Sequence, residues 1–195
     1  MNARLGASLL SLLALAGCGP GHYTGTAMQP AIIAPDVMLA GAESLSFART
    51  GGKLTLLTFG YTRCPDVCPA TLAHWRDARR ALGADTARVR FVFVSGDWRN
   101  DTPATAAAFA RVFDPAFLGV TGDSATIRRI LPAFQAEVGY GGPPGSMTAG
   151  FAHSDFDYLV DEQGRIAFWY PFTVRPEALA QDLKRMLRAH GLVAG

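Results

Sequence analysis

Two cysteines four residues apart, Cys64 and Cys68, are the side chains best suited to do chemistry in this chain. They lie in the stretch Tyr-Thr-Arg-Cys-Pro-Asp-Val-Cys-Pro, directly after an apolar run at 54–59. Pro65 favours an extended conformation at Cys64, and Pro69 suits the first turn of a helix. We therefore expect the pair at a helix N-terminus, where the helix dipole and free backbone N–H groups stabilise thiolates.

The four-residue spacing of the thiols favours a metal site over a structural disulfide. Residues four apart in a regular helix have Cβ atoms about 5–6 Å apart, whereas a disulfide needs roughly 3.5–4.5 Å. Backbone adjustment could still join Cys64 to Cys68, and the resulting strain would make the bond easy to reduce. The pair is therefore a candidate redox couple as well as a metal clamp. Two thiolates favour Cu(I) among metals, whereas a structural zinc site normally needs four protein ligands.

One imidazole would complete a three-coordinate copper site and would also permit Cu(II). The chain contains four histidines: His22, His74, His153 and His190. His22 and His190 lie towards the ends of the chain, and we expect His74 on a helix surface. His153 follows a segment rich in glycine and proline at 139–150, which we expect to be a loop that can fold over the cysteines. The residues alone leave the choice open, because a lone histidine is more often structural.

The N-terminus indicates export. Residues 1–17 combine one basic residue with an apolar stretch too short to span a bilayer, as in a cleaved signal peptide. The sequence Leu-Ala-Gly before Cys18 resembles a bacterial lipobox, which implies acylation of the Cys18 thiol. An ordinary secretory signal with an incidental cysteine is the alternative. We expect residues 18–35 to be a flexible tether and 36–195 the folded domain, lipid-anchored in the bacterial cell envelope on the periplasmic side.

The composition limits the classes of partner. The chain has 18 basic and 16 acidic residues, so its charge gives no reason to expect nucleic acid. About 160 residues after the signal and the tether are enough for one domain with an adequate core.

The pattern of apolar residues predicts strands that alternate with helices. Strands are expected at 54–59, 88–95 and 117–120, helices at 69–82, 103–113, 124–137 and 176–190, and a hairpin at 156–160 and 165–170. This order predicts an α/β domain with a central mixed sheet flanked by helices and a C-terminal hairpin and helix. A cysteine pair at the first strand-to-helix junction favours a thioredoxin-like fold.

The stretch Leu-Thr-Phe-Gly-Tyr-Thr-Arg-Cys-Pro-Asp-Val-Cys-Pro-Ala-Thr-Leu at 57–72 resembles the Sco/SenC family of copper chaperones. Phe-Val-Ser-Gly-Asp at 93–97 and the pair His153-Ser154 continue the resemblance, which covers roughly 35–190. The cysteine stretch is highly specific to the family, and the later segments support it.

The resemblance implies a thioredoxin-like fold with copper bound by Cys64, Cys68 and His153. It also implies a role in assembling cytochrome c oxidase, at the binuclear copper centre of subunit II, as metal donor, thiol reductant or both. The further partners implied are a periplasmic copper donor, a thiol reductant and the membrane that holds the lipid anchor. On this interpretation the protein is a metallochaperone rather than an enzyme, with thiol–disulfide reductase activity left open.

The chain departs from the family pattern next to the histidine. The family usually has an aspartate immediately before it, and this chain has Ala152. If that aspartate orients the imidazole, its loss alters metal affinity unless Asp155 or Asp157 substitutes. The chain also has Asp97-Trp98 where the family tends to have Asp-Pro, and Asp97 could either support the metal ligands or cap a turn.

A metal-free thiol–disulfide oxidoreductase acting on exported proteins is the alternative function. Cys64 would then be the attacking thiol and Cys68 the resolving one, and His153 would have little part in the chemistry. A lipoprotein with a purely structural bridge is a third interpretation, although so short a loop gains little from a disulfide.

Overall fold

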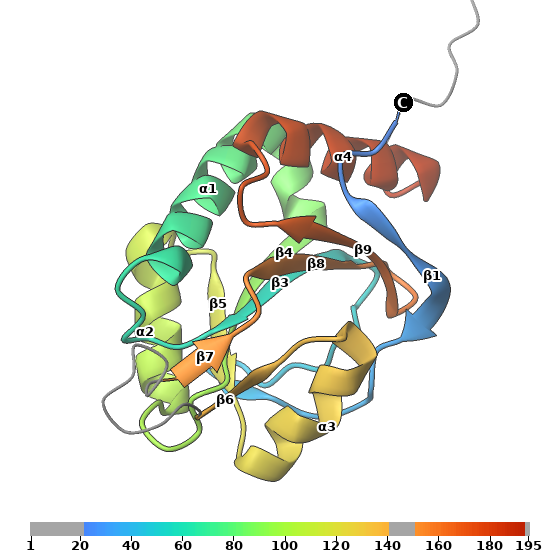
Figure 1. Ribbon diagram of the computed structural model, residues 1–195. Coiled ribbons are helices and arrows are strands. Elements are labelled where there is room, and N and C mark those ends of the chain that lie inside the picture. The colour runs from blue at the N-terminus through green and yellow to red at the C-terminus, as the bar shows by residue number, and fades with distance from the viewer. Residues whose placement is uncertain (1–21, 141–150, 194–195) are drawn as a thin grey trace, which may run out of the picture.

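The computed structural model describes residues 22–140 and 151–193, which fold around a seven-stranded mixed sheet (Figure 1). The strand order is β1-β9-β8-β3-β4-β5-β2, and β6 and β7 form a separate two-stranded sheet. The strands are β1 Thr26–Ile33, β2 Ala40–Gly41, β3 Leu54–Gly60, β4 Val89–Ser95, β5 Leu118–Thr121, β6 Val138–Tyr140, β7 Phe151–His153, β8 Phe156–Val160 and β9 Arg165–Pro171. The helices are α1 Val67–Leu82, α2 Pro103–Phe113, α3 Ser124–Phe134 and α4 Pro176–Ala189, with a 3₁₀ segment at Gly83–Arg88.

The centre of the sheet is β3, in which every residue is buried. It runs parallel to β4 and antiparallel to β8, so the sheet is mixed as predicted. Helices α1, α2 and α4 cover one face of the sheet and α3 covers the other (Figure 1). Because both faces of β3 are covered, its sequence is a continuous apolar run rather than an alternating one.

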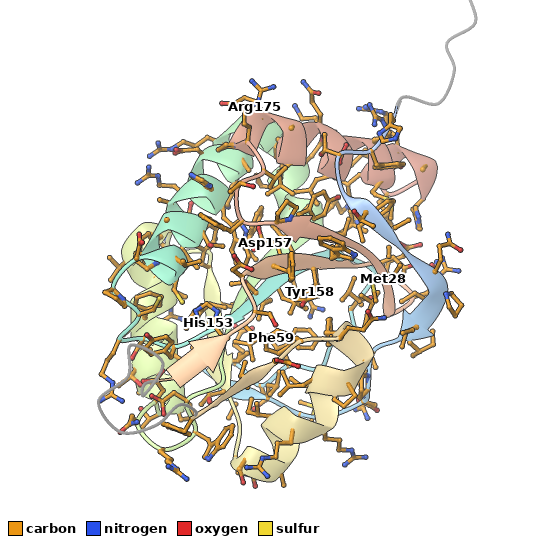
Figure 2. The ribbon with its side chains drawn as sticks, in the orientation of Figure 1. Met28, Phe59, His153, Asp157, Tyr158 and Arg175 are labelled. Atoms are coloured by element: carbon orange, nitrogen blue, oxygen red, sulfur yellow. The ribbon has the colours of Figure 1, made fainter. Side chains whose placement is uncertain are left out.

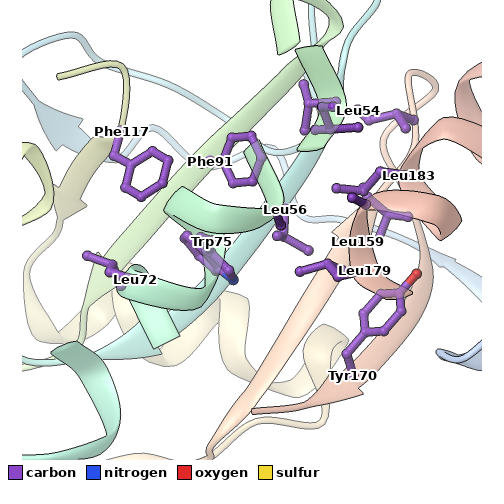
Figure 3. Close-up of a cluster of buried hydrophobic side chains, with 14 of the residues drawn as sticks. Leu54, Leu56, Leu72, Trp75, Phe91, Phe117, Leu159, Tyr170, Leu179 and Leu183 are labelled. Carbon is purple, nitrogen blue, oxygen red and sulfur yellow. The ribbon is translucent and has the colours of Figure 1, made fainter. Parts of the chain in front are cut away.

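Alternate residues of β3 supply two hydrophobic clusters. Leu54 and Leu56 pack with Trp75 of α1 and Leu183 of α4 (Figure 3). Phe59 belongs to the cluster on the opposite face, beneath α3. The clusters fix the end of β3, from which the chain turns into α1.

The predicted strands and helices are all present, and most of their bounds agree within two residues. The largest difference is α3, which ends at Phe134 rather than continuing to 137. Gln135 adopts a left-handed conformation with φ of 50°, and its N–H bonds back to the carbonyls of Leu131 and Pro132. This reversal ends the helix and frees residues 136 and 137 to lead into β6.

The prediction of a flexible tether up to residue 35 is wrong for the described part of that range. Residues Thr26–Ile33 form β1, which pairs antiparallel with β9 at the edge of the sheet. Asp182 of α4 fixes the chain just before β1, because its buried Oδ2 accepts the N–H (2.7 Å) and hydroxyl (2.6 Å) of Thr24. This strand could not be predicted from the sequence, because an edge strand with one buried side chain, Met28, shows no alternating apolar pattern.

The prediction of a loop over 139–150 also needs correction at its start. Residues Val138–Tyr140 form β6, which pairs antiparallel with β7 and so joins the segment before the glycine-rich stretch to His153. Three residues are too few to show a periodic pattern. The remainder of that stretch lies outside the described residues, as do Cys18 and the predicted signal peptide at 1–17.

No helix within 22–140 and 151–193 combines the length and the apolar character needed to cross a membrane.

Candidate metal centre

The turn after β3 places Cys64 before α1 and Cys68 in its first turn, as the two prolines predict. The turn is closed by a hydrogen bond from the N–H of Cys64 to the carbonyl of Tyr61 (3.2 Å). The N–H of Cys68 then points at the Cys64 Sγ at 3.4 Å. Both thiols are free, Cys64 is half-buried and Cys68 is buried. The turn therefore presents one accessible sulfur and one enclosed sulfur to the same space.

Gly60, the last residue of β3, makes room for the enclosed sulfur. A Cβ atom at this position would lie 2.6 Å from the Cys68 Sγ and 2.8 Å from the ring of Phe93. Such distances are far inside van der Waals contact, so only glycine lets α1 approach β3 with Cys68 in this place.

We expect Gly60→Ala to destabilise the domain by about 1–3 kcal/mol, as overpacking of a core usually does, and to weaken metal binding by displacing Cys68. Urea unfolding and copper titration would measure the two effects. Gly139→Ala is a suitable control, because nothing lies within 4 Å of the methyl group it adds. An alanine at 60 with unchanged stability and metal affinity would show that the site does not depend on this close approach.

His153 is the last residue of β7, and the β6–β7 hairpin places its ring against the cysteine turn. Its Nε2 lies 3.4 Å from the Cys68 Sγ and 3.9 Å from the Cys64 Sγ. The three ligand atoms all lie within 4.8 Å of one another. The structure thus brings together three side chains separated by up to 89 positions in the sequence, with their donor atoms facing a common centre.

The tautomer of His153 is set by the backbone carbonyl of the next residue. Its Nδ1 lies 2.9 Å from the carbonyl oxygen of Ser154. Because a carbonyl can only accept, Nδ1 carries the hydrogen and Nε2 directs its lone pair towards the sulfurs. This is the hydrogen bond by which a metal-binding histidine is usually oriented, so the chain orients the ring without an aspartate at position 152.

The two acidic residues considered as substitutes do not orient His153. Asp155 is exposed and uses its backbone carbonyl to accept the N–H of Phe172 (3.1 Å). Asp157 lies on β8, pointing under α1, where its Oδ2 accepts the indole N–H of Trp75 (2.9 Å). Figure 2 shows Asp157 and His153 at separate places along the chain as it enters β8.

The other three histidines lie away from the cysteines. His74 bonds through Nδ1 to the carbonyl of Phe172 (3.3 Å), and His190 pairs with Glu162 (2.7 Å). The carbonyl of His22 accepts from Arg185 on α4. Of the four candidates, the structure therefore selects His153.

Burial governs the protonation of the enclosed thiol. It raises the pKa of Cys68 far above its usual value, and a hydrogen bond from the backbone of Tyr61 offsets this only in part. The expectation that the helix N-terminus would stabilise a thiolate is therefore wrong for Cys68 in the metal-free protein, because desolvation outweighs it. A metal must displace this proton, so metal affinity is expected to fall as the pH is lowered.

Two buried carboxylates brace the cysteine turn from the end of β4. Asp101 accepts the N–H (2.8 Å) and hydroxyl (2.6 Å) of Thr62. Asp97 accepts from Arg63 at 3.0 Å and from the backbone N–H of Asn100 at 3.2 Å. Asp97 therefore both caps its own turn and supports the residue that precedes Cys64.

His153 is also reached from outside through a groove between α3 and β6. The groove has a volume of about 690 Å³, and its lining includes Arg128, Leu131, Val138 and Tyr140 as well as His153. Of the three candidate ligands, His153 is the one that lines this groove.

Comparison with known proteins shows that the sequence of this chain is similar to members of one protein family. A family model described as SCO1/SenC matches residues 38–188. A SCO2-like protein of Rickettsia felis is 31% identical over 137 residues, which cover 68% of this chain and 65% of that protein. Protein SenC of Rhodobacter capsulatus is 31% identical over 139 residues, covering 70% of this chain and 62% of that protein. The matched segment therefore spans just under two thirds of these relatives.

A solved structure extends the similarity to the fold. ScoI of Bradyrhizobium japonicum, determined with copper bound, is 34% identical with a TM-score of 0.70, and the match covers 80% of this chain and 99% of that one. This match confirms the predicted thioredoxin-like fold.

Proposed function

Since the chain belongs to the SCO1/SenC family, we propose that it binds copper through Cys64, Cys68 and His153 and serves in the assembly of cytochrome c oxidase. The observation that carries the proposal is the convergence of two thiols and one correctly oriented imidazole within 4.8 Å. A thioredoxin-like fold alone would not require the histidine, whereas a three-coordinate copper site uses it as the third ligand.

The donor set suits copper as a cargo. Two sulfurs and one nitrogen match Cu(I), which accepts three soft ligands, and the imidazole also permits Cu(II). Within the described residues the site offers three such donors, one fewer than a structural zinc site normally uses. The half-buried Cys64 fits a metal that is taken up and passed on.

A more specific proposal concerns the protein that receives the copper. The Sco family is one of cytochrome c oxidase assembly proteins. We propose that this chain serves the binuclear copper centre of subunit II, by delivering copper or by reducing a disulfide between its cysteines to thiols. A periplasmic copper donor and a thiol reductant would supply it. The signal sequence and Cys18 support a lipid-anchored location in the bacterial cell envelope.

A metal-free thiol–disulfide oxidoreductase is the second candidate, and the unequal exposure of the cysteines favours it. Cys64 is accessible and Cys68 is enclosed, as suits an attacking and a resolving thiol. This function makes no use of the hydrogen bond that directs the His153 Nε2 towards the sulfurs.

The experiment that separates the two functions is Cu(I) titration of the full-length reduced protein beside His153→Ala. We expect one tightly bound copper, with affinity lowered in the variant by at least the roughly 10–100-fold that loss of an outer hydrogen-bond partner typically costs. His74→Ala is the matched control, because His74 bonds to a backbone carbonyl away from the thiols. No tight copper in the wild type, with a readily reduced Cys64–Cys68 disulfide, would establish the oxidoreductase instead.

A further inference from the structure

Among the described residues, the two strands of the hairpin that carries His153 have no strand partner in the main sheet. Strands β6 and β7 pair with each other in a sheet of their own. At the base of the hairpin, the N–H of Ser154 donates to the carbonyl of Glu137 (2.9 Å), and the N–H of Glu137 donates to the Ser154 Oγ (2.8 Å). The chain just after His153 is held by the hydrogen bond from the N–H of Phe172 to the carbonyl of Asp155 (3.1 Å), whereas the other strand of the hairpin, β6, is held to the rest of the domain by side-chain contacts.

One of these contacts fixes the far end of β6. The hydroxyl of Tyr140 donates a hydrogen bond to the Oδ1 of Asp97, whose side chain is 1% exposed. The Tyr140 ring packs edge-on against Trp98, with 5.8 Å between ring centroids, and the Arg99 guanidinium lies 4.3 Å above it. Tyr140 thus ties the hairpin to the segment after β4.

The same carboxylate also binds the cysteine turn. Arg63, directly before Cys64, donates to the Asp97 Oδ2 at 3.0 Å. The side-chain amide of Asn100 donates to both carboxylate oxygens, at 2.9 and 3.0 Å. Hydrogen bonds to an ionised acceptor are roughly twice as strong as neutral ones. Asp97 therefore connects the segment that supplies the cysteines to the segment that supplies the histidine.

We propose that Tyr140 is a positioning residue which, through Asp97, holds the histidine hairpin over the cysteine turn and so slows the release of bound copper. Copper held by ligands from two independent segments is released when the segments separate. The link resists that separation at the end of β6, two residues beyond Val138, the partner of His153 in the hairpin register. The expected effect of this link on the rate of copper release rests on the copper binding proposed above.

The test is the rate at which copper leaves the full-length Cu(I)-loaded protein when a strong Cu(I) chelator is added in excess. Tyr140→Phe keeps the ring and its packing and removes only the hydroxyl. We expect roughly tenfold faster release, at the lower end of what loss of an outer hydrogen-bond partner costs a metal site. Tyr23→Phe is a closely matched control, because that ring also packs on an aromatic residue (Phe168) beneath an arginine (Arg185), beside α4.

A second readout, hydrogen exchange of the metal-free protein, separates positioning from general loss of stability. We expect faster exchange at the amides of β6 and β7 in Tyr140→Phe, with an unchanged thermal unfolding temperature. Unchanged copper release would overturn the proposal, and so would equal acceleration in Tyr23→Phe. If the wild-type protein held no copper, the proposed function would fail, while hydrogen exchange in the hairpin would still decide whether Tyr140 fixes it.

Discussion

Cys64→Ser is expected to lower the Cu(I) affinity of the reduced protein by roughly 100- to 1000-fold. Complete four-ligand metal sites contribute about 10–16 kcal/mol of binding free energy, or on the order of 3–4 kcal/mol for each ligand, and each 1.4 kcal/mol is a factor of ten. A serine hydroxyl is a hard, neutral donor in place of a soft thiolate, so it replaces little of that contribution. Competition titration against a Cu(I) chelator of known affinity would measure the loss.

The chain supplies its own control for this substitution. Cys18→Ser makes the same change at the third cysteine, which lies in the lipobox-like sequence rather than in the site. We expect its copper affinity to match that of the wild type. Because Cys64 is half-buried, serine should not disturb the fold, and an affinity within threefold of the wild type for Cys64→Ser would exclude this thiol as a ligand.

Asp157→Asn is expected to remove a large pH dependence of stability. The Asp157 carboxyl is fully enclosed, and burial raises its pKa to about 7, against a smaller opposing effect of the hydrogen bond from Trp75. In the unfolded chain the same group titrates near 3.8. Between these values the folded protein keeps a proton that the unfolded chain has released.

The sign of the effect follows from this difference. The contribution of Asp157 to the free energy of unfolding is greatest below pH 4, falls as the pH rises towards 7, and then levels off. A shift of about three pKa units corresponds to roughly 4 kcal/mol. We therefore expect the stability of Asp157→Asn relative to the wild type to rise by roughly 3 kcal/mol between pH 5 and pH 8, because about two units of the pKa shift lie in that range.

Urea unfolding at pH 5 and pH 8 would test this, with the difference between variant and wild type compared at the two pH values. Asp77→Asn is the control, because it makes the same change at a fully exposed carboxylate of α1, so its difference from the wild type should not depend on pH in this range. A difference for Asp157→Asn that is the same at both pH values would show that this carboxyl is not protonated in the folded protein.

The parts of the structure that the sequence predicts well are those determined locally. Pro65 and Pro69 restrict the backbone around the cysteines, and the apolar run of β3 has few alternatives to a buried strand. Strand β1 could not be predicted, because an edge strand that buries little besides Met28 leaves no pattern in the sequence. The high pKa of Cys68 was also hidden, because it depends on how closely α1 packs on Gly60.

The candidate site shows the same difference between features that are determined locally and features that depend on the folded chain. The cysteine pair was evident from its spacing, whereas the residues alone left four histidines open, and the family resemblance was needed to choose His153. The orientation of that histidine depends on the carbonyl of Ser154, a group that every residue carries and that no motif can indicate. The link from Tyr140 to Asp97 joins positions 43 apart, which only the folded chain brings together.

The attachment of Thr24 to Asp182 sets how far the site could travel from a membrane. A chain spans at most about 3.5 Å per residue, so an acyl group on Cys18, as proposed, would lie within about 20 Å of Thr24. The segment before β1 lies beside α4, across the molecule from β7, and Figure 2 shows Met28 and His153 towards opposite sides. Such a short connection would keep the domain against the lipid surface, with its copper site facing away from the membrane. A protein that accepts the copper would then have to approach the site, because the domain could not move far towards it.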